Sequence, residues 1–97
     1  MSDAIILAPE AARDLRRLKA RLRSIVRDAI ESHLRHQAAR TSKGRIKRLR
    51  GFSRPQFRLR VDEVRVFYDI RDKTVEVLLV VPKSEAETWL AQAGEKT

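Results

Sequence analysis

Residues 44–68 of this chain read GRIKRLRGFSRPQFRLRVDEVRVFY. Apolar and polar residues alternate in the second half of this stretch, with Phe57, Leu59 and Val61 on one face and Arg58 and Arg60 on the other. Strict alternation is typical of a β-strand, because successive side chains of a strand point to opposite faces. The pattern therefore predicts a strand over 56–61 that holds two arginines on one face.

Two further strands are predicted directly after it. Asp62-Glu63 predicts a tight turn, and alternation resumes over Val64–Ile70. Arg65 falls on the face of that second strand opposite Val64, although the pairing register decides which side of the sheet it occupies. The stretch Val75–Val81 is almost continuously apolar, which is typical of a strand that is central or covered on both faces.

The N-terminal half is predicted to be a short strand followed by helices. Ala4–Leu7 is a short apolar run. Apolar residues then recur every three or four positions from Leu15 to Leu34, which is the period of an amphipathic helix. The stripe is too long for one average helix, so we expect a two-helix hairpin with a break within 19–24. A last short helix is predicted with Ser84 as its N-cap.

This order of elements predicts an α+β fold with an N-terminal strand, a two-helix hairpin on a mostly antiparallel sheet, and a short C-terminal helix. One face of the sheet would pack on the helices, and the other would carry Arg58 and Arg60. Ile46 to Leu49 is expected to be a turn or an edge strand, residues 51–55 a loop, and the tail beyond Gly94 frayed. We interpret 1–97 as a single domain.

The composition excludes several classes of protein. The chain has 97 residues, no Cys, and 42% hydrophobic residues. It therefore has neither disulfides nor thiolate metal sites, and it is too apolar to be wholly disordered. No apolar run reaches the roughly 20 residues of a membrane span, and the N-terminus lacks the features of a signal peptide. We expect a cytoplasmic protein with no membrane partner.

Positive charge is concentrated around the first predicted strand. Residues 43–65 contain nine Lys and Arg and two acids, so that 9 − 2 = 7 of the formal net charge of +9 lies there. A fixed, concentrated positive surface indicates a polyanionic partner, most often nucleic acid. The predicted nucleic-acid-binding residues outside the strands are Lys43, Arg45, Lys47, Arg48, Arg50 and Arg54.

The chain resembles the RelE/ParE superfamily of type II toxins. The resemblance is carried by RLRGFSRPQFRLRVDEVRVFYDI, by VEVLLVVPKSEAETWL and, more weakly, by APEAARDLRRL. Within that superfamily, RelE-like members cut messenger RNA in the ribosome, and ParE-like members poison DNA gyrase without cutting anything. The resemblance implies a cognate antitoxin as partner, together with the ribosome and mRNA, or DNA gyrase in the alternative.

The RelE-like branch implies a metal-independent endoribonuclease with no cofactor. Its catalytic positions fall on Arg58, Arg60, Arg65 and Lys83 of this sequence. Arginines suit the stabilisation of an anionic phosphate, because a guanidinium offers a planar fork of donors to phosphate oxygens. The general base is missing: arginine remains protonated, and the C-terminal tyrosine of the family has no counterpart here.

Three functions stay open at this stage. The leading hypothesis is a ribosome-dependent mRNA endoribonuclease. The incomplete catalytic set favours a ParE-like gyrase inhibitor, and a third hypothesis is an inactive homologue that only binds its antitoxin. The basic face can also be a generic nucleic-acid surface or a surface for an acidic antitoxin alone.

Other polar and aromatic residues have simpler structural interpretations. His33 and His36 lie three apart but lack a third ligand nearby, so no metal site is predicted. Trp89 is expected to pack the last helix on the sheet. Tyr68 is expected to be a buried or hydrogen-bonded scaffold residue and not a catalyst.

Overall fold

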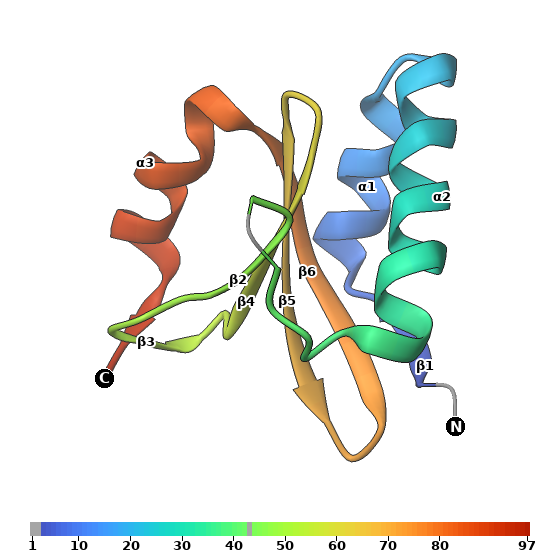
Figure 1. Ribbon diagram of the computed structural model, residues 1–97. Helices are drawn as coiled ribbons and strands as arrows, with labels where there is room; N and C mark the ends of the chain where they lie inside the picture. The colour runs from blue at the N-terminus through green and yellow to red at the C-terminus, as the bar shows by residue number, and fades with distance from the viewer. Residues whose placement is uncertain (1–2, 43) are drawn as a thin grey trace.

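A five-stranded sheet lies between a helical hairpin and a third helix (Figure 1). The computed structural model describes residues 3–42 and 44–97. The helices are α1 (Pro9–Arg17), α2 (Ala20–Gln37) and α3 (Lys83–Ala93). The strands are β1 (Ala4–Leu7), β2 (Ile46–Arg48), β3 (Phe52–Arg54), β4 (Phe57–Val61), β5 (Val64–Arg71), β6 (Thr74–Pro82) and β7 (Glu95–Lys96).

The large sheet has the strand order β1-β6-β5-β4-β2. The last four strands of this order pair antiparallel, whereas β1 pairs parallel with β6 and places Ala4 opposite Thr74. The predicted α+β class and mostly antiparallel sheet are therefore confirmed. The hairpin break lies at Leu18 and Lys19, at the start of the predicted region, because both residues leave the helical region with ψ of 149°.

The main core fills the space between the hairpin and the sheet. The apolar stripe of the helices supplies Leu15, Val26 and Leu34, and the sheet supplies Val66 and Tyr68, all at most 1% exposed. The apolar side chains that recur every 3.6 residues in the helices therefore pack against those that recur every two residues in the strands. This packing fixes which face of the sheet is left for function.

A β-bulge lets β6 contribute to cores on both of its faces. Phe67 pairs with Leu79 but Tyr68 pairs with Val77, so Leu78 is an extra residue in β6. The extra residue reverses the alternation. Val77 therefore faces the hairpin, whereas Leu79 joins Phe67 in a second, smaller core under α3. This confirms that the continuous apolar run is a strand covered on both faces.

Helix α3 covers part of the sheet face opposite the hairpin. Ala86 is buried against Phe67, and the Trp89 ring stacks on Phe67 with 5.3 Å between centroids. The predicted packing role of Trp89 is confirmed. The predicted N-cap is wrong: Pro82 occupies that position, and Ser84 lies inside the first turn. The rigid φ of Pro82 already ends β6 and turns the chain into the helix.

The expected loop and the expected frayed tail form a second, two-stranded sheet. β3 pairs antiparallel with β7, Ser53 Oγ donates to the Glu95 carbonyl at 3.2 Å, and the Thr97 amide donates to the Gly51 carbonyl at 3.0 Å. The predictions of a loop and of a frayed tail were therefore both wrong. The two strands lie 42 residues apart in the sequence at the Ser53–Glu95 contact, and neither segment alone shows the alternation that is typical of a strand.

Two polar contacts, one buried and one partly buried, hold the hairpin against the sheet. The Tyr68 hydroxyl donates to the carbonyl of Ala38, just after α2, at 2.7 Å. β1 pairs with β6 only as far as Val77, and beyond this point Asp14 of α1 accepts the Val80 amide at 3.1 Å. Tyr68 is fully buried, in agreement with its expected scaffold role. No helix of the described residues is long and apolar enough to cross a membrane.

Candidate nucleic-acid interface and active site

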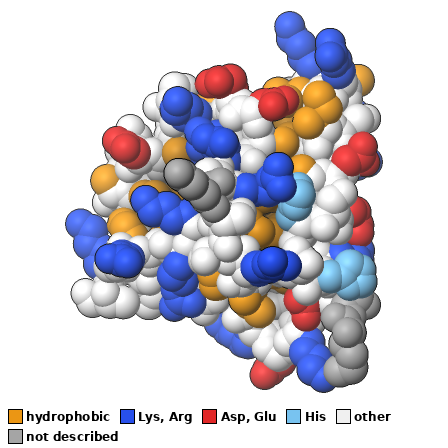
Figure 2. Space-filling view, in the orientation of Figure 1, with side chains coloured by type: hydrophobic (Ala, Val, Ile, Leu, Met, Phe, Trp, Pro, Cys, Tyr) orange, Lys and Arg blue, Asp and Glu red, His pale blue; other side chains and the backbone are white. Residues whose placement is uncertain are grey.

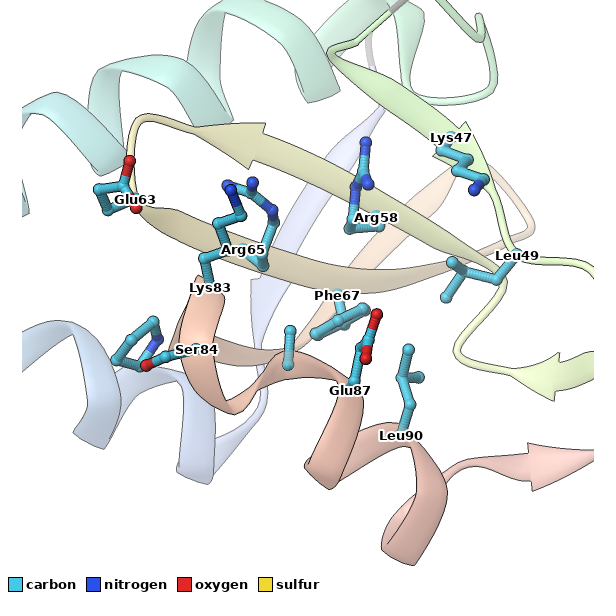
Figure 3. Close-up of a pocket in the computed structure, with 12 residues that line it drawn as sticks. Lys47, Leu49, Arg58, Glu63, Arg65, Phe67, Lys83, Ser84, Glu87 and Leu90 are labelled. Carbon is cyan, nitrogen blue, oxygen red and sulfur yellow. The ribbon is translucent and has the colours of Figure 1, made fainter.

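A cavity of about 690 Å³ lies between the sheet and α3 (Figure 3). It is called the cationic cavity here, because four of its lining side chains are Lys47, Arg58, Arg65 and Lys83. They come from β2, β4, β5 and the first residue of α3. Figure 2 shows that basic side chains also cover much of the central part of the face seen in Figure 1.

The register of β4 and β5 decides how the arginines meet. Arg60 pairs with Arg65, and Arg58 pairs with Phe67. Paired residues of an antiparallel ladder point to the same face, so Arg65 shares the face of Arg58. The sequence left this facing open, and the structure settles it.

Arg65 is held in place by neutral partners. Its side chain is 8% exposed, and one guanidinium nitrogen donates to the carbonyls of Asp62 at 2.9 Å and Val64 at 3.1 Å. No described carboxylate lies within ion-pair distance of it. The positive charge is therefore fixed in direction without being neutralised.

Arg58 is partly buried and incompletely hydrogen-bonded. Its Nε atom is buried and donates to no acceptor among residues 3–42 and 44–97. Burial lowers the pKa of Arg58, and the neighbouring charges of Arg65 and Arg60 lower it further. The side chain remains protonated in this setting, because a guanidinium does not lose its proton in proteins. An anion beside Arg58 would relieve both the repulsion and the missing hydrogen bond.

Lys83 joins the two arginines through the start of α3. Its backbone amide donates to the Glu63 carbonyl at 2.7 Å, which ties α3 to the β4–β5 turn. Figure 3 shows Lys83 below Arg65, and Lys47 on the opposite side beyond Arg58. Of the four predicted catalytic residues, the structure brings Arg58, Arg65 and Lys83 to one cavity.

Arg60, the fourth predicted catalytic residue, lies in a different place. Its guanidinium packs against the connection before β2, where a Cβ added to Gly44 would lie 3.0 Å from a terminal nitrogen of Arg60. There it lines a separate cavity of about 410 Å³ with His33 of α2 and Arg45. The alternation placed Arg60 on the correct strand face, but its guanidinium lies beside Gly44 and lines a different cavity from that of Arg58.

The predicted nucleic-acid-binding residues divide between several surroundings. Lys47 lines the cationic cavity, and it shares a shallow cavity with Arg48 and Arg50. Arg45 lines the cavity of Arg60 and His33 instead. Arg48 also lies over the Phe57 ring, 5.0 Å from its centroid, which is a cation–π contact. Lys43 is outside the described residues.

Arg54 is separated from this group. Its Nε lies 3.6 Å from a carboxylate oxygen of Asp69, and a terminal nitrogen lies 3.4 Å from Glu76. It lines a fourth cavity, together with Pro55 and Trp89. Its charge is balanced locally, so it contributes less to the cationic cavity than its position in the sequence indicated.

The part of the chain that the structure describes contains no cluster of His and acidic side chains able to hold a metal ion. Burial lowers the pKa of His33, and the charge of Arg45 lowers it further.

Sequence reasoning missed the contributions of α3 to the cationic cavity, namely Ser84, Glu87 and Leu90. Lys83, Glu87 and Leu90 are spaced by four and three, a helical spacing that places them on one side.

The arrangement suits recognition of a phosphodiester. Arg58 and Arg65 offer guanidinium donors from adjacent strands, and Lys83 offers a compact ammonium group from α3. Donors fixed before a ligand arrives stabilise developing negative charge without reorganising. The cavity is therefore equipped to bind an anionic phosphate and to stabilise it as its charge increases.

The family model that matches residues 5–87 describes the ParE toxin of the type II toxin-antitoxin system parDE. The chain belongs to this toxin family. The match spans most of the chain, including both helices of the hairpin and the strands that form the cationic cavity. No curated protein matches the chain.

Solved structures of toxins share the fold. The toxin-antitoxin complex RelBE2 from Mycobacterium tuberculosis contains a chain that is 26% identical, with a TM-score of 0.69 over 84% of this chain and 99% of that chain. A chain of the RelB–RelE complex from Methanococcus jannaschii is 17% identical, with a TM-score of 0.64 over 87% of this chain and 96% of that chain. A free mutant of Escherichia coli toxin RelE is 21% identical, with a TM-score of 0.67 over 92% of each chain.

Proposed function

We propose that this toxin cleaves messenger RNA in the ribosome. The observation that carries the proposal is the convergence of Arg58, Arg65 and Lys83 on one cavity, with the buried Nε of Arg58 lacking an acceptor among the described residues. RNA supplies its own nucleophile, since the 2′-OH attacks the adjacent phosphate. The protein then has to orient the phosphodiester, stabilise its added charge and move protons.

A cognate antitoxin is proposed as the second partner. The solved relatives from Mycobacterium tuberculosis and Methanococcus jannaschii are complexes of a toxin with an antitoxin. The four basic side chains of the cationic cavity favour an acidic antitoxin segment at this face, because complementary charge accelerates and orients association. Such a segment would block the site that the mRNA uses.

The proposal is tested by removing two cations of the cationic cavity, with a thermal melt to confirm that the variant is folded. Both Arg58→Ala and Lys83→Ala replace side chains at the cavity without touching the main core. The double variant should lose toxicity and should produce no new mRNA 5′ ends after brief induction without antitoxin. The matched control is Arg16→Ala with Arg17→Ala, because these exposed residues of α1 carry the same total charge. The control should retain new ends inside translated codons.

The description of the matching family favours a second candidate function. A ParE-like toxin would use the same basic face to bind DNA gyrase and would perform no chemistry. A DNA-damage reporter in the same cells separates the two. A strong damage signal without new mRNA ends would overturn the nuclease proposal and support the gyrase inhibitor.

A further inference from the structure

We infer that Glu87 is the general base of the cleavage reaction, which rests on the proposed nuclease function. The group that accepts the 2′-OH proton is the missing part of the site: the strands contribute Lys47, Arg58 and Arg65 to the cavity, and arginine remains protonated. A carboxylate is a competent base when it lies within hydrogen-bond reach of that hydroxyl. The lining of the cationic cavity contains two carboxylates, Glu63 and Glu87.

The positions of the two carboxylates favour Glu87. In Figure 3, Glu87 projects from α3 toward the sheet face beside Phe67, on the side of the cavity where Arg58 lies. Glu63 sits at the β4–β5 turn, at the end of the cavity beyond Arg65. Glu87 is therefore the carboxylate that projects between the sheet and α3 on the side of Arg58.

Glu87 is also free to act. No Lys or Arg of residues 3–42 and 44–97 forms an ion pair with it, although Arg58, Arg65 and Lys83 line the same cavity. Its carboxylate is therefore not already occupied by a structural partner and is available to a substrate hydroxyl.

Lys83 and Glu87 are four residues apart on α3, so they lie on the same side of the helix with Cβ atoms roughly 5–6 Å apart. Two long side chains at this spacing can reach opposite sides of one phosphodiester. Glu87 takes the proton of the 2′-OH, and the 2′-oxygen forms a bond to phosphorus. The bond from phosphorus to the 5′-oxygen breaks, and that oxygen takes a proton from the Lys83 ammonium group. The products are a 2′,3′-cyclic phosphate and a 5′-hydroxyl end.

The test is single-turnover cleavage of ribosome-bound mRNA by Glu87→Gln. The matched control is Glu85→Gln, which removes the same charge from the first turn of α3 outside the cavity lining. Loss of a general base typically costs roughly 10²–10⁴-fold, so Glu87→Gln should cleave at least about 100-fold more slowly. Glu85→Gln should cleave at the wild-type rate. Thermal melts of both variants confirm that they are folded.

Binding and pH separate a base from a merely electrostatic residue. Removing a negative charge from a cationic cavity should leave the half-saturating ribosome concentration unchanged or lower it, while the cleavage rate falls. The pH–rate profiles of the wild type and Glu87→Gln should also differ in shape, because a general base contributes to such a profile. Glu87→Asp should recover part of the rate.

Three results would overturn the inference. An unchanged cleavage rate in Glu87→Gln contradicts it, because removal of the general base must slow the reaction. A loss confined to Glu63→Gln assigns the base to the turn. A wild-type chain that leaves every ribosome-bound mRNA intact rejects the proposed nuclease function itself, and the role of Glu87 with it.

Discussion

At the scale of single residues, Tyr68 connects the sheet to the end of α2. Its ring stacks on Phe57 with centroids 5.4 Å apart, and its hydroxyl donates to the Ala38 carbonyl at 2.7 Å. Burial raises its pKa well above the usual value, so the hydroxyl stays protonated as a donor. Tyr68→Phe should lower the free energy of unfolding by about 1–2 kcal/mol, measured by urea denaturation.

Cleavage or toxicity should survive in Tyr68→Phe at a temperature where the variant is folded. A folded Tyr68→Phe protein without activity would contradict the scaffold role and assign chemistry to the hydroxyl.

Asp14 predicts a pH dependence of stability. Burial raises the pKa of its carboxyl above the ordinary 3.8, although the bond from the Val80 amide opposes this. The folded chain therefore holds this proton more tightly than the unfolded chain. The stability that Asp14 contributes is greatest below pH 3.8 and is lost as the pH rises through the raised pKa.

Asp14→Asn keeps an acceptor for the Val80 amide but does not titrate. Its stability relative to the wild type should therefore increase as the pH rises from about 4 to 7, measured by urea denaturation at each pH. Asp14→Ala removes the acceptor and should be less stable than Asp14→Asn at every pH. A constant difference between wild type and Asp14→Asn would refute the raised pKa.

At the scale of elements, α3 and β7 are joined by a tightly packed glycine. A Cβ on Gly94 would lie 2.6 Å from Phe52 Cε1 and 2.7 Å from the Leu90 carbonyl oxygen. Backbone cannot move away as a flexible side chain can, so Gly94→Ala should separate β7 from β3. We expect a loss of about 1–3 kcal/mol in the free energy of unfolding and faster proteolysis of the tail.

Gln92→Ala is the control for Gly94→Ala, because it changes an exposed position of the same helix and should alter stability by less than about 0.5 kcal/mol. Equal stability and equal proteolysis of the two variants would mean that β7 contributes nothing to the fold.

The elements that the sequence predicted are those with a long local pattern. The helical hairpin and the strands β4, β5 and β6 each show their period over several residues, so hydrophobic patterning alone defines them. β3 and β7 have three and two residues and exist only because they pair with one another. No local signal distinguishes such segments from loop and tail.

The candidate site was predictable to a similar extent. The alternation placed Arg58 on a strand face, but the position of Arg65 depended on register and that of Arg60 on its contact with Gly44. Glu87 is a polar residue on an exposed helix in the sequence. It became part of the site only when the contacts of Ala86 and Trp89 with Phe67 oriented α3.

At the scale of the whole molecule, the net charge of +9 predicts salt-dependent binding to RNA. Each phosphate contact on single-stranded RNA contributes a slope of about −0.7 to the dependence of log affinity on log salt. Arg58→Ala with Lys83→Ala should reduce the magnitude of that slope by up to about 1.4. Fluorescence anisotropy with a short labelled RNA at several salt concentrations measures it.

The Arg16→Ala and Arg17→Ala control has the same net charge as the cavity variant. A smaller change of slope in this control would show that contacts in the cavity, and not the total charge, determine RNA binding. Equal changes in the two double variants would contradict a localised RNA site.

The parallel pairing of β1 with β6 has a consequence for synthesis of the toxin. Ala4 pairs with Thr74, so β1 can join the sheet only after β6 has been synthesised. Contacts between such distant residues form slowly, because a long loop must close first. Arg58 and Arg65 are translated well before Lys83 and α3. A nascent chain therefore lacks a complete cationic cavity until translation is nearly over, and a prematurely terminated chain should be harmless to the cell that makes it.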